Sequence, residues 1–155
     1  MSFTDLAKTP ISEIKQRDPV LVSTSTTLGE IVALLANNNR GSVLVTDGEG
    51  KLVGIFTENN LVRQVDFSSD WKAEAVAGHM TTKVQTAAPN TSMTTALLRM
   101  TAGRFRQLPI VSRDDKPVGI VSIRDIISHI AHCYPKEFVN LPPSPDHEPS
   151  ETWGG

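Results

Sequence analysis

The sequence lacks several features that would each point to a particular class of protein. Cys133 is the only cysteine among 155 residues, which excludes an intramolecular disulfide and a four-cysteine zinc site. No apolar run approaches the roughly 20 residues that span a bilayer, and the N-terminal residues contain no apolar stretch of the kind that signal peptides carry. We therefore expect a cytoplasmic protein with no membrane partner.

The sequence also has no excess of basic charge and no catalytic fingerprint. Its formal net charge is −2, which argues against a nucleic-acid partner. It contains no glycine-rich dinucleotide motif, no Walker loop and no catalytic serine motif. His129, His132 and Cys133 lie close together, but no carboxylate or second cluster completes a metal site. We expect a protein that is not an enzyme, binds no metal and requires no cofactor.

An internal repeat is the strongest positive feature of the sequence. The segment 53–62 resembles 118–127, so that Gly54 matches Gly119 at a separation of 65 residues. The same separation holds upstream, where two apolar stripes with helical spacing coincide. Leu28, Ile31, Val32 and Leu35 correspond to Met93, Ala96, Leu97 and Met100. A register shared over this length indicates two copies of one structural unit.

Each copy predicts the same order of elements, β-α-β-β-α. The expected elements are extended pieces at 20–22 and 84–86, helices at 27–38 and 92–103, strands at 42–46 and 107–111, strands at 52–56 and 117–121, and final helices beginning at Thr57 and Ser122. One such unit is too small to bury much surface alone. The sequence therefore predicts a mixed α/β (α+β) fold in which two repeats pack sheet to sheet with approximate two-fold symmetry.

The repeats also define the expected domain boundaries. Residues 1–66 are expected to form the first repeat with its N-terminal lead-in, 67–77 a connecting segment, 78–133 the second repeat, and 134–155 a tail. Short helices are expected at 4–8 and 70–75. The tail is rich in proline and polar residues, a composition typical of disordered segments.

The doubled signature resembles that of a known family. A glycine, two apolar residues, Ser or Thr, and then Asp or Asn three residues later follow the same strand in both copies, at 54–60 and 119–125. This pattern resembles the CBS family, named after cystathionine β-synthase, and two such repeats form a Bateman module, here a stand-alone one. The resemblance covers about residues 10–132.

The resemblance implies a regulatory ligand-sensing module. Family members bind an adenosine nucleotide such as AMP, ADP or ATP between the two repeats, and they signal by a change of conformation or of dimer arrangement. We therefore expect a homodimer that acts on a protein partner in trans. The alternative is a CBS-type dimerisation or docking module whose ligand sites are vestigial.

Ser122 and Asp125 are the first candidates for the main site. The resemblance implies that Asp125 accepts hydrogen bonds from ribose hydroxyls, with Ser122 beside the ribose or phosphate. A carboxylate accepts two O–H donors in strong, charge-assisted bonds. The local pattern alone favours another role, because Ser-x-x-Asp at a helix start resembles a capping box. Both roles are compatible, since Ser122 can cap while Asp125 binds.

Further members of the main site follow from the resemblance. Arg106 would bind phosphate oxygens in a bidentate manner, and Lys15, with Arg17, would reach phosphates from the segment before the first strand. Ile120 and Val20 would line an apolar slot for adenine, although such residues are usually ordinary core.

A second, weaker site is expected on the first repeat. It would contain Thr57, Asn60, Ile55 and Gly41. Asn60 stands where the second repeat has Asp125, and an uncharged amide with one acceptor oxygen holds a ribose diol less well. Gly41 corresponds to Arg106 and offers room instead of charge, while Arg40 is a lesser basic candidate. We expect one good site, built on Asp125, and one weak or empty site.

Overall fold

The computed structural model describes residues 3–38 and 40–133. The first repeat contains β1 (Leu21–Ser23), α2 (Leu28–Asn38), β2 (Ser42–Thr46), β3 (Leu52–Thr57) and α3 (Glu58–Gln64). The second contains α4 (Met93–Gly103), β4 (Gln107–Val111), β5 (Pro117–Ser122) and α5 (Ile123–Cys133). Short helices precede each repeat, namely α1 (Phe3–Ala7) and η1 (Ile11–Glu13), and then η2 (Trp71–Ala73) and η3 (Val76–Gly78). The tail expected to be disordered lies outside the described residues.

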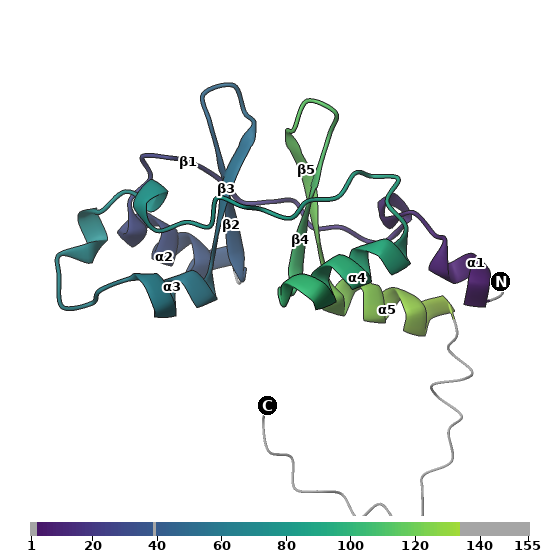
Figure 1. Ribbon diagram of the computed structural model, residues 1–155. Coiled ribbons are helices and arrows are strands. Elements are labelled where there is room, and N and C mark those ends of the chain that lie inside the picture. Colours follow the sequence, from purple (N-terminus) through teal and green to yellow (C-terminus); the bar gives the residue numbers. More distant parts are fainter. Residues whose placement is uncertain (1–2, 39, 134–155) are drawn as a thin grey trace, which may run out of the picture.

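The strands form two small sheets that face one another. In the first repeat β1 pairs in parallel with β2, and β2 pairs antiparallel with β3; in the second, β4 and β5 form an antiparallel hairpin. Figure 1 shows the β2–β3 and β4–β5 hairpins side by side at the centre, with α2 and α3 on one half and α4 and α5 on the other. The predicted mixed α/β fold with sheet-to-sheet packing is confirmed.

The second repeat differs from the first in one strand. The extended piece expected at 84–86 is not a strand, and only an isolated bridge between Ala87 and Ile110 remains. In the first repeat the Leu44 N–H donates to the Val20 carbonyl (2.9 Å). The residue equivalent to Leu44 is Pro109, which has no N–H and cannot make that bond. One proline thus shortens the second sheet.

Equivalent residues of the two repeats contact each other at the centre of the molecule. The Ser42 hydroxyl donates to Oε1 of Gln107, its counterpart 65 residues later. Ile55 and Ile120, another equivalent pair, belong to one buried cluster with Leu44. Because equivalent groups can meet in this way only near a symmetry axis, the two repeats are related by an approximate two-fold axis that passes between these pairs.

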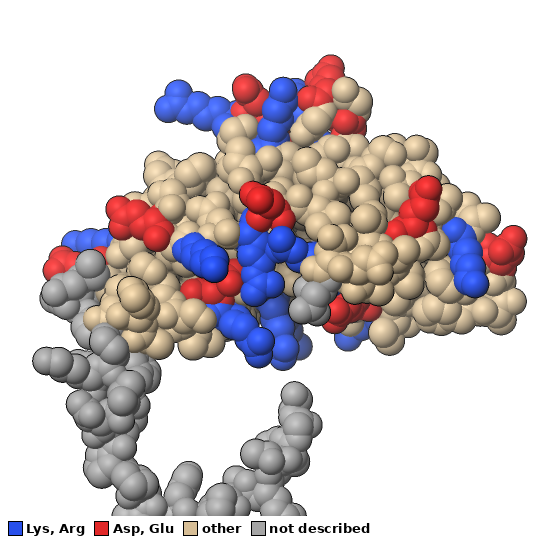
Figure 2. Space-filling view, turned by 180° about the vertical axis from the view of Figure 1, so that it is seen from behind, with Lys and Arg blue, Asp and Glu red and all other residues tan. Residues whose placement is uncertain are grey.

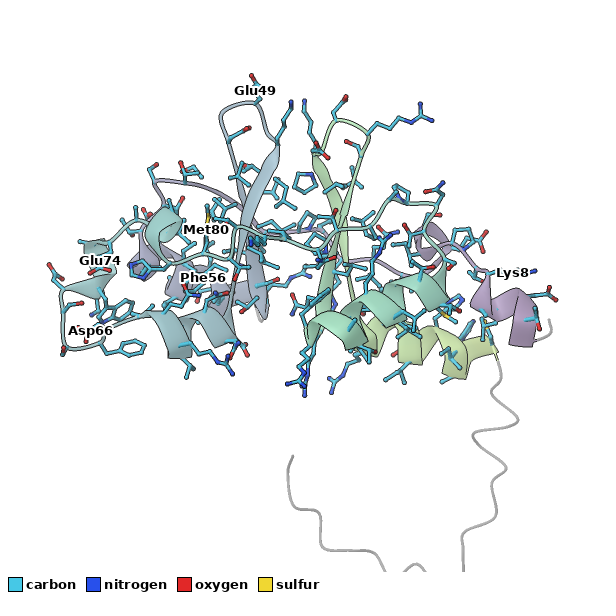
Figure 3. The ribbon with its side chains drawn as sticks, in the orientation of Figure 1. Lys8, Glu49, Phe56, Asp66, Glu74 and Met80 are labelled. Atoms are coloured by element: carbon cyan, nitrogen blue, oxygen red, sulfur yellow. The ribbon has the colours of Figure 1, made fainter. Side chains whose placement is uncertain are left out.

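The segment before the first repeat belongs to the core of the second. Leu6, Ile11 and Ile14 are buried in the same cluster as Met93 and other residues of the second repeat. The Ile11 N–H donates to the Thr91 carbonyl, and the Met93 N–H donates to the Thr9 carbonyl, both at 2.8 Å. In Figure 3, Lys8 accordingly lies at the end of the molecule occupied by the second repeat.

The connecting segment completes the first repeat in the same way. Val76 is fully buried in the cluster that contains Leu28 and Ile31, and Trp71 packs against it. The Val76 N–H donates to the Thr26 carbonyl (2.8 Å), and the Leu28 N–H donates to the Glu74 carbonyl (2.9 Å). Each repeat is therefore completed by the segment that precedes the other, which joins the two halves into one body.

The signature glycines make room for these crossing segments. A Cβ atom on Gly54 would clash with Sδ of Met80, and one on Gly119 would clash with Oε1 of Gln16. Met80 and Gln16 lie on the two segments that cross between the halves, and Figure 3 shows Met80 beside the first sheet. A side chain at either glycine would therefore require the flexible end of Met80 or Gln16 to move.

The helices of this fold are short. Among residues 3–38 and 40–133, none has both the length and the apolar character that crossing a membrane requires.

The exchange of segments makes a testable prediction about stability. Ile11→Ala should lower the free energy of unfolding by about 2–5 kcal/mol, because it removes a fully buried side chain. Hydrogen exchange should accelerate more in α4 than in α2, although Ile11 precedes the first repeat. Val76→Ala, the control at the equivalent position, should show the opposite preference. Faster exchange of α2 in the Ile11 variant would contradict the exchange of segments.

Candidate functional site

Two clefts lie between the repeats, and the first is narrow. The lead-in residues 17–20 form one wall, Arg40–Ser42 and Leu44 of the first repeat form another, and the second repeat contributes Gln107, Ile120, Ser122 and Asp125. Its volume is about 30 Å³, room for about two water molecules. A larger ligand would therefore need this narrow cleft to open.

Asp125 caps a helix and faces the narrow cleft at the same time. Its Oδ2 accepts a hydrogen bond from the Ser122 N–H (2.9 Å), while its own N–H donates to the Ser122 hydroxyl (3.1 Å). The other oxygen, Oδ1, lies 3.6 Å from Nε of Arg17. The capping role is therefore present in the structure, and one carboxylate oxygen remains directed at the cleft.

Arg40 brings an unsatisfied donor to the same cleft. Its Nη1 is buried, and none of the described residues accepts a hydrogen bond from it. Leaving a buried charged donor without an acceptor costs more than about 1–3 kcal/mol, so such groups usually have a partner.

The second cleft is much wider. The first repeat contributes Ile55, residues 57–60 and Arg63; the start of the second repeat contributes Thr81 and residues 83–85, and its later part contributes residues 103–107 and Pro109. Its volume is about 710 Å³, within the range of about 300–1,000 Å³ that small-molecule sites occupy. Gly41 and Gln107 line both clefts.

Asn60 is engaged in internal hydrogen bonds at the edge of the wide cleft. Its Oδ1 accepts from the Thr57 N–H and the Thr57 hydroxyl, both at 2.9 Å. Its Nδ2 donates to the Thr81 hydroxyl (3.0 Å), and its side chain is buried. The amide of Asn60 thus forms the same kind of capping box as the carboxylate of Asp125. Both its oxygen and its nitrogen are already hydrogen-bonded within the protein.

The structure brings most of the predicted site residues together. Val20, Ile120, Ser122 and Asp125 line the narrow cleft, while Ile55, Thr57 and Asn60 line the wide one. Their roles toward a ligand stay predictions.

Two predicted members of the main site lie elsewhere. Arg106 follows the C-terminal end of α4, and it lines the wide cleft together with Gly103, Arg104 and Phe105 instead of facing Asp125. Lys15 is exposed and is not among the described residues that line either cleft. The basic group that contacts Asp125 is Arg17, and Arg40, which the sequence suggested only as a lesser candidate, lines the same cleft.

Sequence reasoning missed three basic residues of the wide cleft. Arg63, Lys83 and Arg104 come from α3, the start of the second repeat and the end of α4. Arg104 could have been suggested by its position two residues before Arg106 in the sequence. Nothing in the local pattern shows that Lys83 crosses to the first repeat.

The two clefts differ in charge. The narrow one has Arg17 and Arg40 against Asp18 and Asp125. The wide one is lined by the basic side chains of Arg63, Lys83, Arg104 and Arg106, and its one acidic side chain among the described residues is that of Glu58. Figure 2, which views the molecule from behind, shows Lys and Arg side chains with Asp and Glu side chains among them near the middle of that face.

The histidines and the cysteine of α5 do not form a metal centre. Sγ of Cys133 lies 3.6 Å from Nε2 of His129. Within the part of the chain that the structure describes, no group of three or more His, Cys, Asp or Glu side chains could hold a metal ion.

Comparison with known proteins agrees with the repeated architecture. The CBS domain family model matches residues 11–66 and again residues 73–132. The chain belongs to the CBS-domain family. An uncharacterised 17.7 kDa protein of Acidianus ambivalens is 32% identical over 130 residues, covering 84% of this chain and 78% of that protein. An inosine-5′-monophosphate dehydrogenase of Methanocaldococcus jannaschii is also 32% identical, but the match spans only 22% of it and 74% of this chain.

Solved CBS-domain structures share the fold. The CBS-domain containing protein ATU1752 of Agrobacterium tumefaciens matches with a TM-score of 0.72 and 32% identity, covering 79% of this chain and 99% of that one. The CBS domain pair of protein MJ0100, solved in complex with 5′-methylthioadenosine and S-adenosyl-L-methionine, has the same TM-score at 22% identity. The match covers 81% of this chain and 98% of the MJ0100 chain. At this identity it supports the fold alone.

The capping role of Asp125 gives a prediction that separates stability from binding. Asp125→Ala should lower the free energy of unfolding by about 0.5–1.5 kcal/mol, because the Ser122 N–H loses its acceptor in the capping box while the Ser122 hydroxyl still caps α5. Asp125→Asn should lower it less, since Asn60 performs the same capping in the first repeat. Chemical denaturation of both variants measures the difference. No loss in Asp125→Ala would show that this bond contributes nothing, and equal losses in the two variants would show that an amide cannot replace the carboxylate.

Proposed function

We propose that the chain is a regulatory module that senses an adenosine nucleotide such as AMP, ADP or ATP in the narrow cleft between its CBS repeats. One observation carries this proposal. Asp125 of one repeat and Arg40 of the other line the same cleft, and Nη1 of Arg40 is buried with no acceptor among the described residues. A nucleotide carries the complement of both groups, namely hydroxyl donors on its ribose and anionic oxygens on its phosphate.

Each side chain that lines the narrow cleft would contact a different part of the nucleotide. The Oδ1 atom of Asp125 would accept hydrogen bonds from the ribose hydroxyls, while Oδ2 continues to cap α5. Arg40 would donate to a phosphate oxygen and so satisfy its buried N–H. Ile120 and Val20, which line the same cleft, would enclose the adenine ring.

The small volume of the narrow cleft suggests how ligand binding would change the conformation of the module. A nucleotide fits only if the narrow cleft widens, where the lead-in segment and the second repeat are joined by two backbone hydrogen bonds between Arg17 and Ile120 (3.2 Å) and by the Arg17–Asp125 ion pair. This pair contributes little stability, because the Arg17 side chain is 48% exposed and the interaction is screened by water. Binding would therefore select a more open arrangement of the two halves.

MJ0100, which shares the fold, was solved with two adenosine-containing molecules, and the same ligand class for this chain is part of the proposal. The particular nucleotide is part of the proposal. We further propose that the module has no catalytic activity, requires no cofactor and acts in the cytoplasm on a protein partner in trans.

A homodimer is also part of the proposal. The exposed apolar side chains of Val62 on α3 and Ile127 on α5 stand at equivalent positions, 65 residues apart, with 76% and 58% exposure. Leu98 on α4 is 64% exposed. Apolar side chains at symmetry-related places on the helices favour contact with a second copy of the chain.

One observation favours the alternative of a docking module with vestigial sites. Asn60 and Asp125 both serve capping boxes, so the signature residues have a structural purpose without any ligand. Thermal denaturation in the presence of adenosine ligands decides between the two functions.

Thermal denaturation with millimolar AMP, ADP, ATP, NAD, S-adenosylmethionine or cyclic di-AMP tests the proposal. A ligand present at 100 times its Kd adds about 2.7 kcal/mol to stability, which raises the Tm by roughly 5–10 °C in a chain of this size. Asp125→Asn and Arg40→Gln should each reduce the shift caused by the preferred adenosine ligand.

Two charge changes at exposed positions serve as matched controls. Asp114→Asn and Arg124→Gln change the same charges at exposed positions outside both clefts, and they should leave the shift unchanged. The absence of a shift with every ligand would favour the docking module. A shift that is equal in wild type and in the Asp125 and Arg40 variants would mean that the nucleotide binds elsewhere.

A further inference from the structure

The basic side chains that line the wide cleft are not neutralised by the surrounding protein. Arg63, Lys83, Arg104 and Arg106 are all exposed, and within residues 3–38 and 40–133 none of them forms an ion pair. Glu58 is the one acidic side chain among the described residues that line this cleft. The wide cleft is therefore a positively charged surface that attracts an acidic group.

Two of these charges depart from the two-fold repeat. The 65-residue register pairs Arg104 with Asn39 and Arg106 with Gly41. Arg104 ends α4 in the left-handed region, with φ 56° and ψ 42°, where glycine or asparagine is preferred. Because the fold requires an arginine at neither position, the positive charge of the wide cleft needs another explanation.

The complementary charge of the chain lies in the segment after α5. Among residues 134–155 a single basic residue, Lys136, stands against four acidic ones, which gives the segment a formal net charge of −3. The chain as a whole has a net charge of −2, so the remainder has a net charge of +1. Three of the four acidic residues, Asp146, Glu148 and Glu151, fall within six positions. The chain thus combines a basic cleft with one short acidic sequence.

This acidic sequence is within reach of the wide cleft. The Ile123 N–H, at the first residue of α5, donates to the Arg106 carbonyl (3.0 Å). The 11 residues of α5 span roughly 16 Å, and Figure 1 shows the helix ending at the outer end of the second repeat. Residues 134–145 then separate Cys133 from Asp146. Twelve residues extend to at most about 40 Å, and a flexible chain of that length has a typical end-to-end distance of about 17–21 Å.

The lining of the wide cleft also suits a peptide of this composition. Apolar side chains of Ile55, Val84 and Phe105 lie among the basic ones, and the cavity has a volume of about 710 Å³. The acidic sequence alternates carboxylates with Pro149 and other uncharged residues. A segment with both kinds of group can pair its charges and cover apolar surface at the same time.

We propose that residues 146–151 dock in the wide cleft of the same chain, with their carboxylates against its basic side chains. Each exposed ion pair is weak on its own. Tethering compensates for this weakness, because a short linker gives the segment an effective concentration of about millimolar. The proposal does not rest on nucleotide binding in the narrow cleft.

Paramagnetic broadening of amide signals in the isotopically labelled full-length chain tests the docking without any nucleotide. A nitroxide is attached at Thr152→Cys in a Cys133→Ser background, which leaves one thiol because Cys133 is the only cysteine. The amide signals of Arg63, Lys83 and Arg104 should lose about half of their intensity or more. Those of η2, at the far end of the first repeat, should be unaffected.

Charge variants of the acidic sequence decide whether electrostatics hold it. Asp146→Asn with Glu148→Gln and Glu151→Gln should restore the intensities, as should 0.5 M salt, because screening weakens exposed charge pairs. The matched control Glu49→Gln with Asp70→Asn and Asp114→Asn makes the same change of net charge at exposed positions outside both clefts. This control should leave the broadening unchanged.

Variants of the cleft provide the reciprocal test. Arg104→Asn with Arg106→Gln should also restore the intensities, and asparagine suits the left-handed position, so this variant should fold. Arg113→Asn with Arg124→Gln, at exposed positions outside both clefts, should not restore them.

Three results would overturn the proposal. The first is an absence of broadening around the wide cleft in the wild-type sequence. The second is broadening that persists in both the acidic-sequence variant and the Arg104/Arg106 variant. The third is equal broadening in a mixture of isotopically labelled chain with separate spin-labelled chain, since the segment of a second copy would then be the occupant.

Discussion

The exchange of lead-in segments between the two repeats is the interaction on which the rest of the structure depends. Ile11 and Ile14 are buried in the core of the second repeat, and Val76 is buried in the core of the first. Burying a side chain of this size contributes roughly 1.5–3 kcal/mol. A repeat of this length cannot form an adequate core alone, so each half needs the segment that precedes the other. The clefts exist because those segments must cross between the halves.

The crossing also explains why each cleft contains parts of both repeats. Residues 17–20 run from the first repeat's lead-in past Ile120 and Asp125, and residues 81–85 run past Ile55 and Asn60. Gly54 and Gly119 give these segments room. A ligand in either cleft would touch a crossing segment and both halves at once. Binding is therefore coupled to the relative position of the repeats by the same contacts that hold the fold together.

Much of the fold could be predicted from the sequence, because the pattern that specifies it is local and occurs twice. Strand β2 has the predicted bounds, and α4 begins one residue after its predicted start. The exchange of segments could not be predicted, since the apolar spacing around Ile11 is the same whichever core buries it. The absence of a first strand in the second repeat could be predicted only from Pro109. Its missing N–H prevents the hydrogen bond that the Leu44 N–H makes to the Val20 carbonyl in the first repeat.

The candidate site was predictable where it lies within one element and not where it spans several. Ser122 and Asp125 lie at one helix start, and their relation follows from sequence spacing. Arg106 was expected beside Asp125, but the two-fold axis passes between Ser42 and Gln107 and leaves it on the other cleft. Arg40, the buried donor near Asp125, has a role only after the halves are assembled. Symmetry explains the fold, and departures from symmetry at Asp125, Asn60, Arg104 and Arg106 distinguish the clefts.

The central claim is that a nucleotide binds between the repeats and contacts both. An NMR titration of the isotopically labelled chain with the adenosine nucleotide that gives the largest thermal shift tests this most directly. The account predicts the largest amide shifts around Arg17 and Val20 of the lead-in, Arg40 of the first repeat, and Ile120 and Asp125 of the second. Shifts confined to the outer faces of the helices, or to one repeat alone, would contradict it.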